Sequence, residues 1–147
     1  MYKKIINKNI FLIFWANGLS VLEGCQKCGY KSIDRIADDT VKGKTGIMEQ
    51  EFGVTLDDLY AEDCLERVYG QYRFPNNINV LLALTDMRKG EYADAVGIRP
   101  TEYGKYQRME RRPYAKTIKK TAELFEISTI ELLFGRARVE FDLDRRG

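Results

Sequence analysis

Apolar residues in the second half of the chain recur with the spacing of an α-helix, in short segments separated by turn-forming residues. The spacing predicts five helices there, over about residues 77–86, 88–96, 100–108, 114–125 and 128–134. The predicted inward positions are Ile78, Leu81, Leu82, Thr85, Tyr92, Ala93, Val96, Tyr103, Tyr106, Ile118, Ala122 and Phe125. We expect Gly97 to end the second helix in a left-handed conformation and Pro100 to begin the third, where its missing N–H is not needed. A capping box at 128–131 predicts the start of the fifth.

The end of the chain shows a different period. Apolar and charged side chains alternate from Val139 to Leu143, which predicts a short C-terminal strand. An extended arm packed on a partner and a frayed terminus are the alternatives.

The first half of the chain repeats the order of the second half, with lower similarity. An offset of 68 residues aligns Asn9 with Asn77, Ile10 with Ile78, Glu23 with Glu91 and Gly29 with Gly97. Capping boxes at 20–23 and 55–58 predict the starts of two helices, and the segment 61–69 predicts another. A candidate third helix covers residues 31–37. Its expected buried residues are Ile33 and Ile36, and its expected exposed residues are Lys31, Asp34 and Arg35.

A segment rich in Gly, Pro and Asn separates the two halves. Residues 70–77 lack helical periodicity and predict a linker. Residues 1–70 hold 9 basic and 11 acidic side chains, a formal charge of −2, whereas residues 71–147 hold 15 and 11, a formal charge of +4. We therefore expect an all-α protein of two small helical domains, residues 1–70 and residues 71–147.

Composition narrows the classes of function. The chain of 147 residues is 44% hydrophobic and 31% charged, which favours a folded protein. It contains no His, which excludes His-based catalytic triads and His metal ligands. The sequence shows neither a catalytic constellation nor a phosphate-binding glycine motif. We expect a protein that is not an enzyme and that uses no cofactor.

The longest apolar run, residues 10–16, is much shorter than the roughly 20 residues that span a bilayer. Lys3 and Lys4 precede this run, and residues 22–25 faintly resemble a lipoprotein cleavage site, but polar residues interrupt the run. We expect a buried first helix in a cytoplasmic protein with no membrane partner. A secretory signal is the alternative.

The sequence CQKC at residues 25–28 has the spacing of a metal or redox motif. Structural zinc needs four N or S ligands, and without His only Cys64 and a carboxylate could complete the set. No βαβ pattern accompanies the motif, as a redox pair would require. We favour two small buried residues at the positions that Ala93 and Val96 occupy in the second half, and we predict no metal site.

The second and third predicted helices of the second half are short, and the turn between them contains Gly97. This is the pattern of a helix-turn-helix. Such a motif needs polar side chains that reach base edges and cations that contact phosphates. Residues 86–120 hold 10 Lys and Arg against 5 Asp and Glu, so a net charge of +5 is concentrated there. A solvated charged face is the alternative.

Residues 80–135 resemble the phage repressor-like helix-turn-helix family, of the Cro/cI or XRE type. The similarity rests on the sequences ADAVGI at 93–98, YGKYQ at 103–107, RRP at 111–113 and LFEISTIELL at 124–133. Residues 9–60 resemble the same family weakly. The resemblance implies that each domain is a lambda-repressor-like helix-turn-helix bundle, and that the second binds double-stranded DNA in the major groove.

The resemblance also implies a set of DNA-contacting residues. In the family, the start of the second helix and the loop after the third bind phosphate, and exposed positions of the third helix contact bases. On this sequence the set is Lys89, Arg99, Thr101, Glu102, Lys105, Arg108, Arg111 and Arg112. The chain departs from the family in having Lys89 where Gln is usual and Pro100 at a position that often contacts bases. Glu102 repels phosphate, although it could accept a hydrogen bond from cytosine N4.

We therefore expect a sequence-specific DNA-binding regulator of transcription, repressor-like in style, that acts as a homodimer or through tandem units. Asp38 and Asp39 follow the candidate third helix of the first half and oppose phosphate binding. We expect this half to be a degenerate module for dimerisation or for a protein partner, with a second DNA contact as the alternative. The competing hypothesis is a protein-interaction module, such as an antitoxin, an anti-repressor or an inhibitor of phage defence, that keeps the fold.

Overall fold

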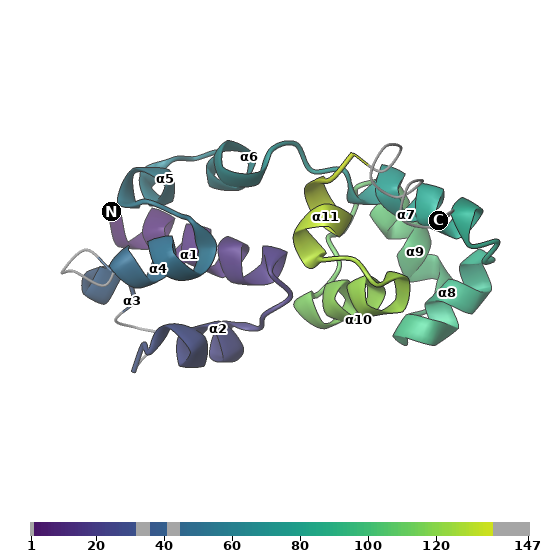
Figure 1. Cartoon of the computed structure of the whole chain (residues 1–147), viewed down its shortest axis with the longest axis horizontal. Helices are drawn as coiled ribbons and strands as arrows, with labels where there is room; N and C mark the ends of the chain where they lie inside the picture. The colour runs from purple at the N-terminus through teal and green to yellow at the C-terminus, as the bar shows by residue number, and fades with distance from the viewer. Residues whose placement is uncertain (1, 32–35, 41–44, 137–147) are drawn as a thin grey trace. The chain divides into compact units, whose positions relative to one another are not determined.

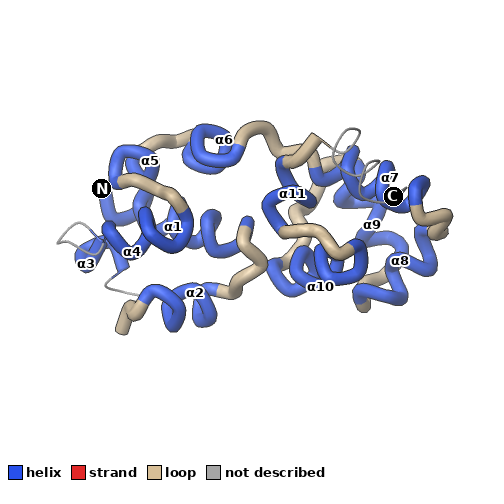
Figure 2. Tube along the Cα trace, viewed as in Figure 1, coloured by secondary structure: helices blue, strands red, loops and turns tan. Residues whose placement is uncertain are grey.

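The computed structural model describes residues 2–31, 36–40 and 45–136. Over these residues the chain forms eleven α-helices and no strand, so the all-α prediction is confirmed (Figure 1, Figure 2). The strand predicted at residues 139–143 lies outside the described residues. The chain divides into two compact units, which we call unit 1 (residues 1–70) and unit 2 (residues 71–147).

Unit 1 is built around its first helix. Its described helices are α1 (Tyr2–Ala16), α2 (Val21–Cys28), α3 (Ile36–Asp39), α4 (Thr45–Phe52), α5 (Leu56–Tyr60) and α6 (Cys64–Tyr69). Ile6, Ile10, Ile13 and Phe14 repeat along one face of α1, and none has exposed surface. This face contacts α2, α3, α5 and α6. Full burial of each of the four side chains contributes about 1.5–3 kcal/mol.

Unit 2 follows the predicted helices closely. Its described helices are α7 (Phe74–Leu84), α8 (Lys89–Val96), α9 (Pro100–Gln107), α10 (Ala115–Phe125) and α11 (Thr129–Phe134). The predicted inward residues are buried, with the exception of Thr85. Thr85 is exposed at the end of α7, where its hydroxyl donates to the Leu81 carbonyl at 2.7 Å. Thr85 therefore follows the helical spacing of the core residues, but its side chain makes a local hydrogen bond and not a core contact.

Helix α7 begins about three residues earlier than the sequence predicts. The helix begins at Phe74, inside the segment 70–77 that the sequence marks as a linker. Pro75 lies in the first turn, where a helix does not need its N–H. Phe74 is fully buried, and its ring lies 6.0 Å from that of Tyr106, so a tertiary contact fixes this extra turn.

Two predictions for unit 1 need correction. The described helix α3 covers Ile36–Asp39, so Asp38 and Asp39 lie within a helix instead of following one. Ile36 is buried as expected, whereas Ile33, Asp34 and Arg35 lie outside the described residues. The last helix begins at Cys64 and not near residue 61. The helix α5 ends at Tyr60, and the carbonyl of its C-cap residue Ala61 accepts a side-chain hydrogen bond from Asn9 of α1.

The two units repeat one hydrogen-bond pattern at the offset of 68 residues. After the first helix of each unit, Leu19 N–H donates to Phe14 and Met87 N–H donates to Leu82, both at 2.9 Å. After the second helix, Tyr30 N–H donates to Cys25 and Ile98 N–H donates to Ala93, again at 2.9 Å. Positive φ angles also recur in register, at Gly18 and Asp86 and at Gly29 and Gly97. Residues 9–30 and 77–98 therefore share one local structure.

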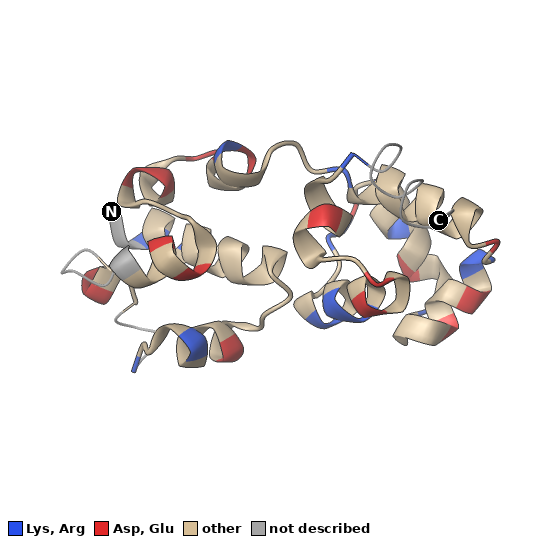
Figure 3. Cartoon of the chain, viewed as in Figure 1, with Lys and Arg blue, Asp and Glu red and all other residues tan. Residues whose placement is uncertain are grey.

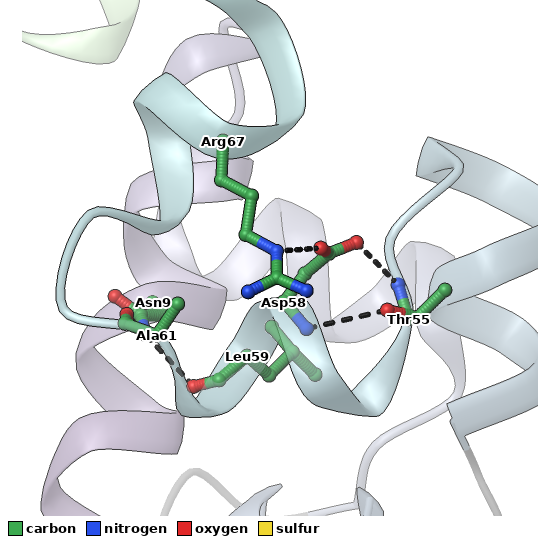
Figure 4. Close-up of polar contacts among 6 residues, drawn as sticks. All are labelled: Asn9, Thr55, Asp58, Leu59, Ala61 and Arg67. Atoms are coloured by element: carbon green, nitrogen blue, oxygen red, sulfur yellow. Dashed lines mark hydrogen bonds and ion pairs between the residues drawn. The ribbon is translucent and has the colours of Figure 1, made fainter.

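A buried asparagine ties the first helix of each unit to a later one. In unit 1, Asn9 Nδ2 donates to the carbonyls of Leu59 at 2.7 Å and Ala61 at 2.8 Å, at the end of α5 (Figure 4). In unit 2, Asn77 Nδ2 donates to the carbonyls of Leu132 and Gly135, both at 2.9 Å, at the end of α11. Both side chains satisfy carbonyls that a helix end leaves free.

The capping boxes at the starts of these later helices also correspond. Thr55 and Asp58 exchange side-chain to backbone hydrogen bonds at α5, with Arg67 on the same carboxylate at 2.9 Å (Figure 4). Ser128 and Glu131 make the same exchange at α11. The offset between these boxes is 73 residues, so unit 2 has five more residues than unit 1 before this point. Both predicted boxes are confirmed.

No single described helix is both long and apolar enough to cross a membrane. The segments Lys4–Ala16 and Val21–Cys28 reach that length and composition only together, across a bend of 98°.

Candidate nucleic-acid interface

The turn between α8 and α9 has the conformation that its sequence predicts. Gly97 has φ 76°, in the left-handed region that favours glycine, and its N–H bonds to the end of α8. Three residues later Pro100 begins α9. Glu91 accepts a hydrogen bond from the backbone N–H of Arg88 at 3.1 Å, which fixes the start of α8. The two helices are therefore delimited on both sides of the turn.

The inner face of α9 is held by two tyrosines and a polar chain. Tyr103 and Tyr106 are each 2% exposed. The Tyr103 hydroxyl donates to Asn79 of α7, and Asn79 Nδ2 donates to Gln107 Oε1 at 2.7 Å. Gln107 Nε2 in turn donates to the Pro75 carbonyl at 3.1 Å. These bonds fix the rotation of α9 about its axis, and so fix which side chains it exposes.

Lys89 and Arg99 lie at the starts of α8 and α9, respectively, and both are exposed. The Lys89 ammonium is 5.6 Å from the centre of the Tyr103 ring, a cation–π distance that ties it to the adjoining helix. Arg99 is the N-cap residue of α9. Thr101, in the first turn of α9, is also exposed.

Glu102 differs from its predicted role as an exposed position. Its side chain is only 19% exposed, and Oε1 lies 2.7 Å from Arg111 Nη1 and 3.8 Å from Lys105 Nζ. This hydrogen bond raises the pKa of Arg111. Glu102 therefore neutralises part of the predicted basic set. The predicted exposure of Glu102 is wrong because helical spacing indicates only the direction in which a side chain points. It does not show that Arg111 and Lys105 lie beside it.

The remaining cations of the set lie around the end of α9. Lys105 is 43% exposed and Arg108 is 60% exposed. Arg108 Nη2 lies 2.9 Å from Glu110, and this hydrogen bond lowers the pKa of the Glu110 carboxyl. Arg112 lies with its guanidinium 5.4 Å from the ring centre of Tyr72. The structure thus brings the eight predicted residues to α8, α9 and the loop after them, in one unit.

Sequence reasoning left out a further group of cations. Lys116, Lys119 and Lys120 lie exposed on α10, directly after the predicted phosphate-binding loop (Figure 3). Their signal was present in the sequence, because Lys116 and Lys120 are four residues apart and so share one face of a helix. A cleft of about 580 Å³ adjoins both this face and the start of α9.

The three cysteines are buried and free in unit 1. Desolvation raises the pKa of Cys28 and of Cys64 to about 11, so both thiols are protonated near neutral pH and react poorly as nucleophiles. Cys28 Sγ lies 4.0 Å from the Met48 sulfur, as a core residue does. Within the described ranges, no group of three or more His, Cys, Asp or Glu side chains could hold a metal ion.

No protein-family model matches the chain, and no curated protein or solved structure is significantly similar to it.

Proposed function

We propose that unit 2 is a helix-turn-helix domain that binds duplex DNA, and that the protein is a sequence-specific, repressor-like regulator of transcription. The observation that carries the proposal is the pair α8 and α9, joined through the left-handed Gly97, with α9 fixed by two buried tyrosines. A helix held in this way can enter the major groove with its outer side chains facing base edges.

The outer surface of this pair has the side chains that such a contact needs. Thr101 and Lys105 offer hydrogen bonds from the exposed side of α9. Lys89 and Arg112 are cations held against aromatic rings, which limits their conformational freedom before phosphate is bound. The chemistry supports base contacts from α9 and phosphate contacts on either side of it.

A single small module buries only about 600–1,000 Å² on DNA, so useful affinity usually requires two. We propose a homodimer on two half-sites about one helical turn apart. Unit 1, with its formal charge of −2, is proposed as the dimerisation or partner-binding module.

The test is selection of bound fragments from a random pool of duplex oligonucleotides, followed by fluorescence anisotropy on the enriched sequence. We expect enrichment of a two-part sequence and an affinity that falls steeply as salt rises, because cations that bind phosphate release counterions. Light scattering of the complex gives the number of protein chains. No enrichment, together with an affinity that does not depend on salt, would contradict the proposal.

Two ion pairs favour a second candidate, a protein-interaction module on the same fold. Arg111 is engaged by Glu102 and Arg108 by Glu110, which reduces the positive charge available to DNA. An antitoxin, an anti-repressor or an inhibitor of phage defence would need less positive charge than a DNA-binding protein. Retention on DNA that is unchanged in a Lys105→Ala/Arg108→Ala variant, with a partner protein still bound, would favour this candidate.

A further inference from the structure

The cleft in unit 2 has the size of a small-molecule site. Its volume of about 580 Å³ falls within the roughly 300–1,000 Å³ of typical ligand pockets. It lies between the turn after α8, the first part of α9 and the start of α10. Its apolar lining includes Val96 and Ile98, so the hollow combines apolar walls with polar groups.

The charged side chains that line the cleft are mostly cations. They are Arg99, Arg111, Lys116 and Lys120, against the single carboxylate of Glu102. Arg111 is paired with Glu102, whereas the other three cations form no ion pair with any residue that the structure describes. The Lys120 ammonium lies beside the turn, 3.7 Å from where a Cβ on Gly97 would be. An anion in the cleft would therefore meet three unpaired cations.

One helix start adds backbone donors to these cations. Helix α10 begins after Tyr114, and this N-cap side chain does not bond to the first turn. The N–H groups of an uncapped first turn attract anions. The partial positive charge of this helix end and the three cations thus act on the same hollow.

Two tyrosines, Tyr106 and Tyr114, also line the cleft. Tyr106 is buried. Tyr114 is 67% exposed and offers a flat ring to a ligand. An exposed aromatic ring beside an anion site suits a planar group attached to a phosphate.

We propose that this cleft binds the phosphate of a small phosphorylated molecule that carries a planar ring. Lys116, Lys120 and Arg99 contact the phosphate, and Tyr114 contacts the ring. DNA backbone phosphate has the same anion chemistry, and the experiment below distinguishes the two sources of phosphate. The site does not depend on DNA binding. An effect of the ligand on DNA binding rests on the proposed function. A ligand that draws Arg111 away from Glu102 leaves the Glu102 carboxylate on α9 without its partner.

The experiment is isothermal titration of the full chain with three probes: adenosine monophosphate, inorganic phosphate and adenosine. We expect the monophosphate to bind, phosphate to bind more weakly and adenosine not to bind. Lys116→Ala/Lys120→Ala is expected to weaken binding of the monophosphate by about tenfold or more, since it removes two charge-assisted contacts to the phosphate. The matched control is Lys119→Ala, because Lys119 is exposed on the same helix but does not line the cleft.

The ring contact has a separate variant. Tyr114→Ala is expected to weaken the monophosphate while leaving inorganic phosphate unchanged. Far-UV circular dichroism checks the fold of each variant, and Lys116→Gln replaces the double variant if that chain does not fold.

Three results would overturn the proposal. The first is a wild-type chain that binds neither the monophosphate nor phosphate. The second is an equal loss in the Lys119→Ala control, which would mean a diffuse attraction to charge. The third combines two observations: no free phosphorylated probe binds the wild-type chain, and Lys116→Ala/Lys120→Ala weakens binding to duplex DNA. These lysines would then be contacts to the DNA backbone. That last result would leave the proposed DNA binding intact.

Discussion

Unit 1 and unit 2 share a scaffold of turns and buried asparagines, yet they differ in core side chains and in surface charge. The core difference is clearest at one pair of positions. In unit 1, Phe14 fills the space beside Gly24, where a Cβ would overlap its ring. At the offset of 68, unit 2 has Leu82 and Tyr92. The bulkier side chain of the pair therefore lies on the first of the two helices in unit 1 and on the second in unit 2, while the scaffold of turns persists.

Surface charge separates the units more sharply. The formal charge is −2 for unit 1 and +4 for unit 2. Lys89, at the start of α8, corresponds to Val21 at the start of α2, so unit 1 has an apolar side chain where unit 2 has a cation. Hydrogen bonds inside a scaffold tolerate few changes, whereas surface side chains can change at little cost in stability. A shared fold therefore does not imply a shared partner.

The largest expected effect separates the surfaces of the two units. Lys105→Ala/Arg108→Ala in unit 2 should weaken binding to the selected duplex by about 100-fold, because it removes two cations from the surface proposed to face the DNA. The control is Lys27→Ala, on α2 of unit 1. Fluorescence anisotropy measures both. An equal loss in the control would show that unit 1 also contacts DNA.

The buried asparagines test whether the shared scaffold contributes equally to each unit. Asn9→Ala and Asn77→Ala should each cost about 3 kcal/mol, since two carbonyls lose their donor in unit 1 and three in unit 2. The single Trp of the chain, Trp15, lies in unit 1 and reports its unfolding in urea. Asn9→Ala should shift the Trp15 transition. Asn77→Ala should shift circular dichroism while leaving Trp15 unchanged.

The exposed Asn76 provides the matched control, as Asn76→Ala leaves both transitions in place. A Trp15 transition that moves in Asn77→Ala would mean that the two units unfold as one.

The different side chains at the Phe14 and Gly24 positions of the two units predict a smaller effect on stability. Gly24→Ala should destabilise unit 1 by about 2 kcal/mol, because the added methyl group overlaps the Phe14 ring. Phe14→Leu in the same chain should recover part of that loss, since unit 2 has leucine at this position. A double-mutant cycle followed by Trp15 fluorescence measures the coupling. Additive effects would show that the two positions do not share a space.

The smallest expected effect concerns acid. Hydrogen bonds from Thr55 and Arg67 lower the pKa of Asp58 below its ordinary 3.8 (Figure 4). The folded pKa is below the unfolded one, so the stabilisation is present above pH 3.8 and is lost as pH falls through the folded value. Asp58→Asn should cost about 1 kcal/mol at pH 7, because it removes a carboxylate from the first turn of a helix, and less at pH 3.

The control for this variant is Asp57→Asn, an exposed residue of the same turn. An Asp58→Asn cost that is equal at the two pH values would contradict the assigned bonds.

Local chemistry explains which parts of the fold the sequence could predict. Gly97, Pro100 and the capping box at Ser128 each favour one backbone conformation, and α8 ends while α9 and α11 begin where these residues predict. The early start of α7 could not be predicted, because the buried ring of Phe74 fixes it through a contact with α9. Side-chain propensity carries no information about such a contact.

The candidate site shows the same limit. Helical spacing placed Tyr103 and Tyr106 inside and Thr101 outside, as the structure has them. It could not show that Glu102 engages Arg111, since the two residues are nine positions apart and meet only when α9 and the following loop fold together. The lysines of α10 were visible as a spacing, but their position beside a cleft depends on the packing of three helices.

The ion pair of Glu102 affects how a salt titration of DNA binding is interpreted. In the proposed DNA complex, Arg111 exchanges a carboxylate at 2.7 Å for a phosphate, so its binding would release fewer ions than that of a solvated cation. The slope of affinity against salt would then be smaller than the number of phosphate contacts implies. Glu102→Gln should steepen that slope and tighten binding at low salt. The carboxylate would thus make the proposed recognition less dependent on ionic strength, at some cost in affinity.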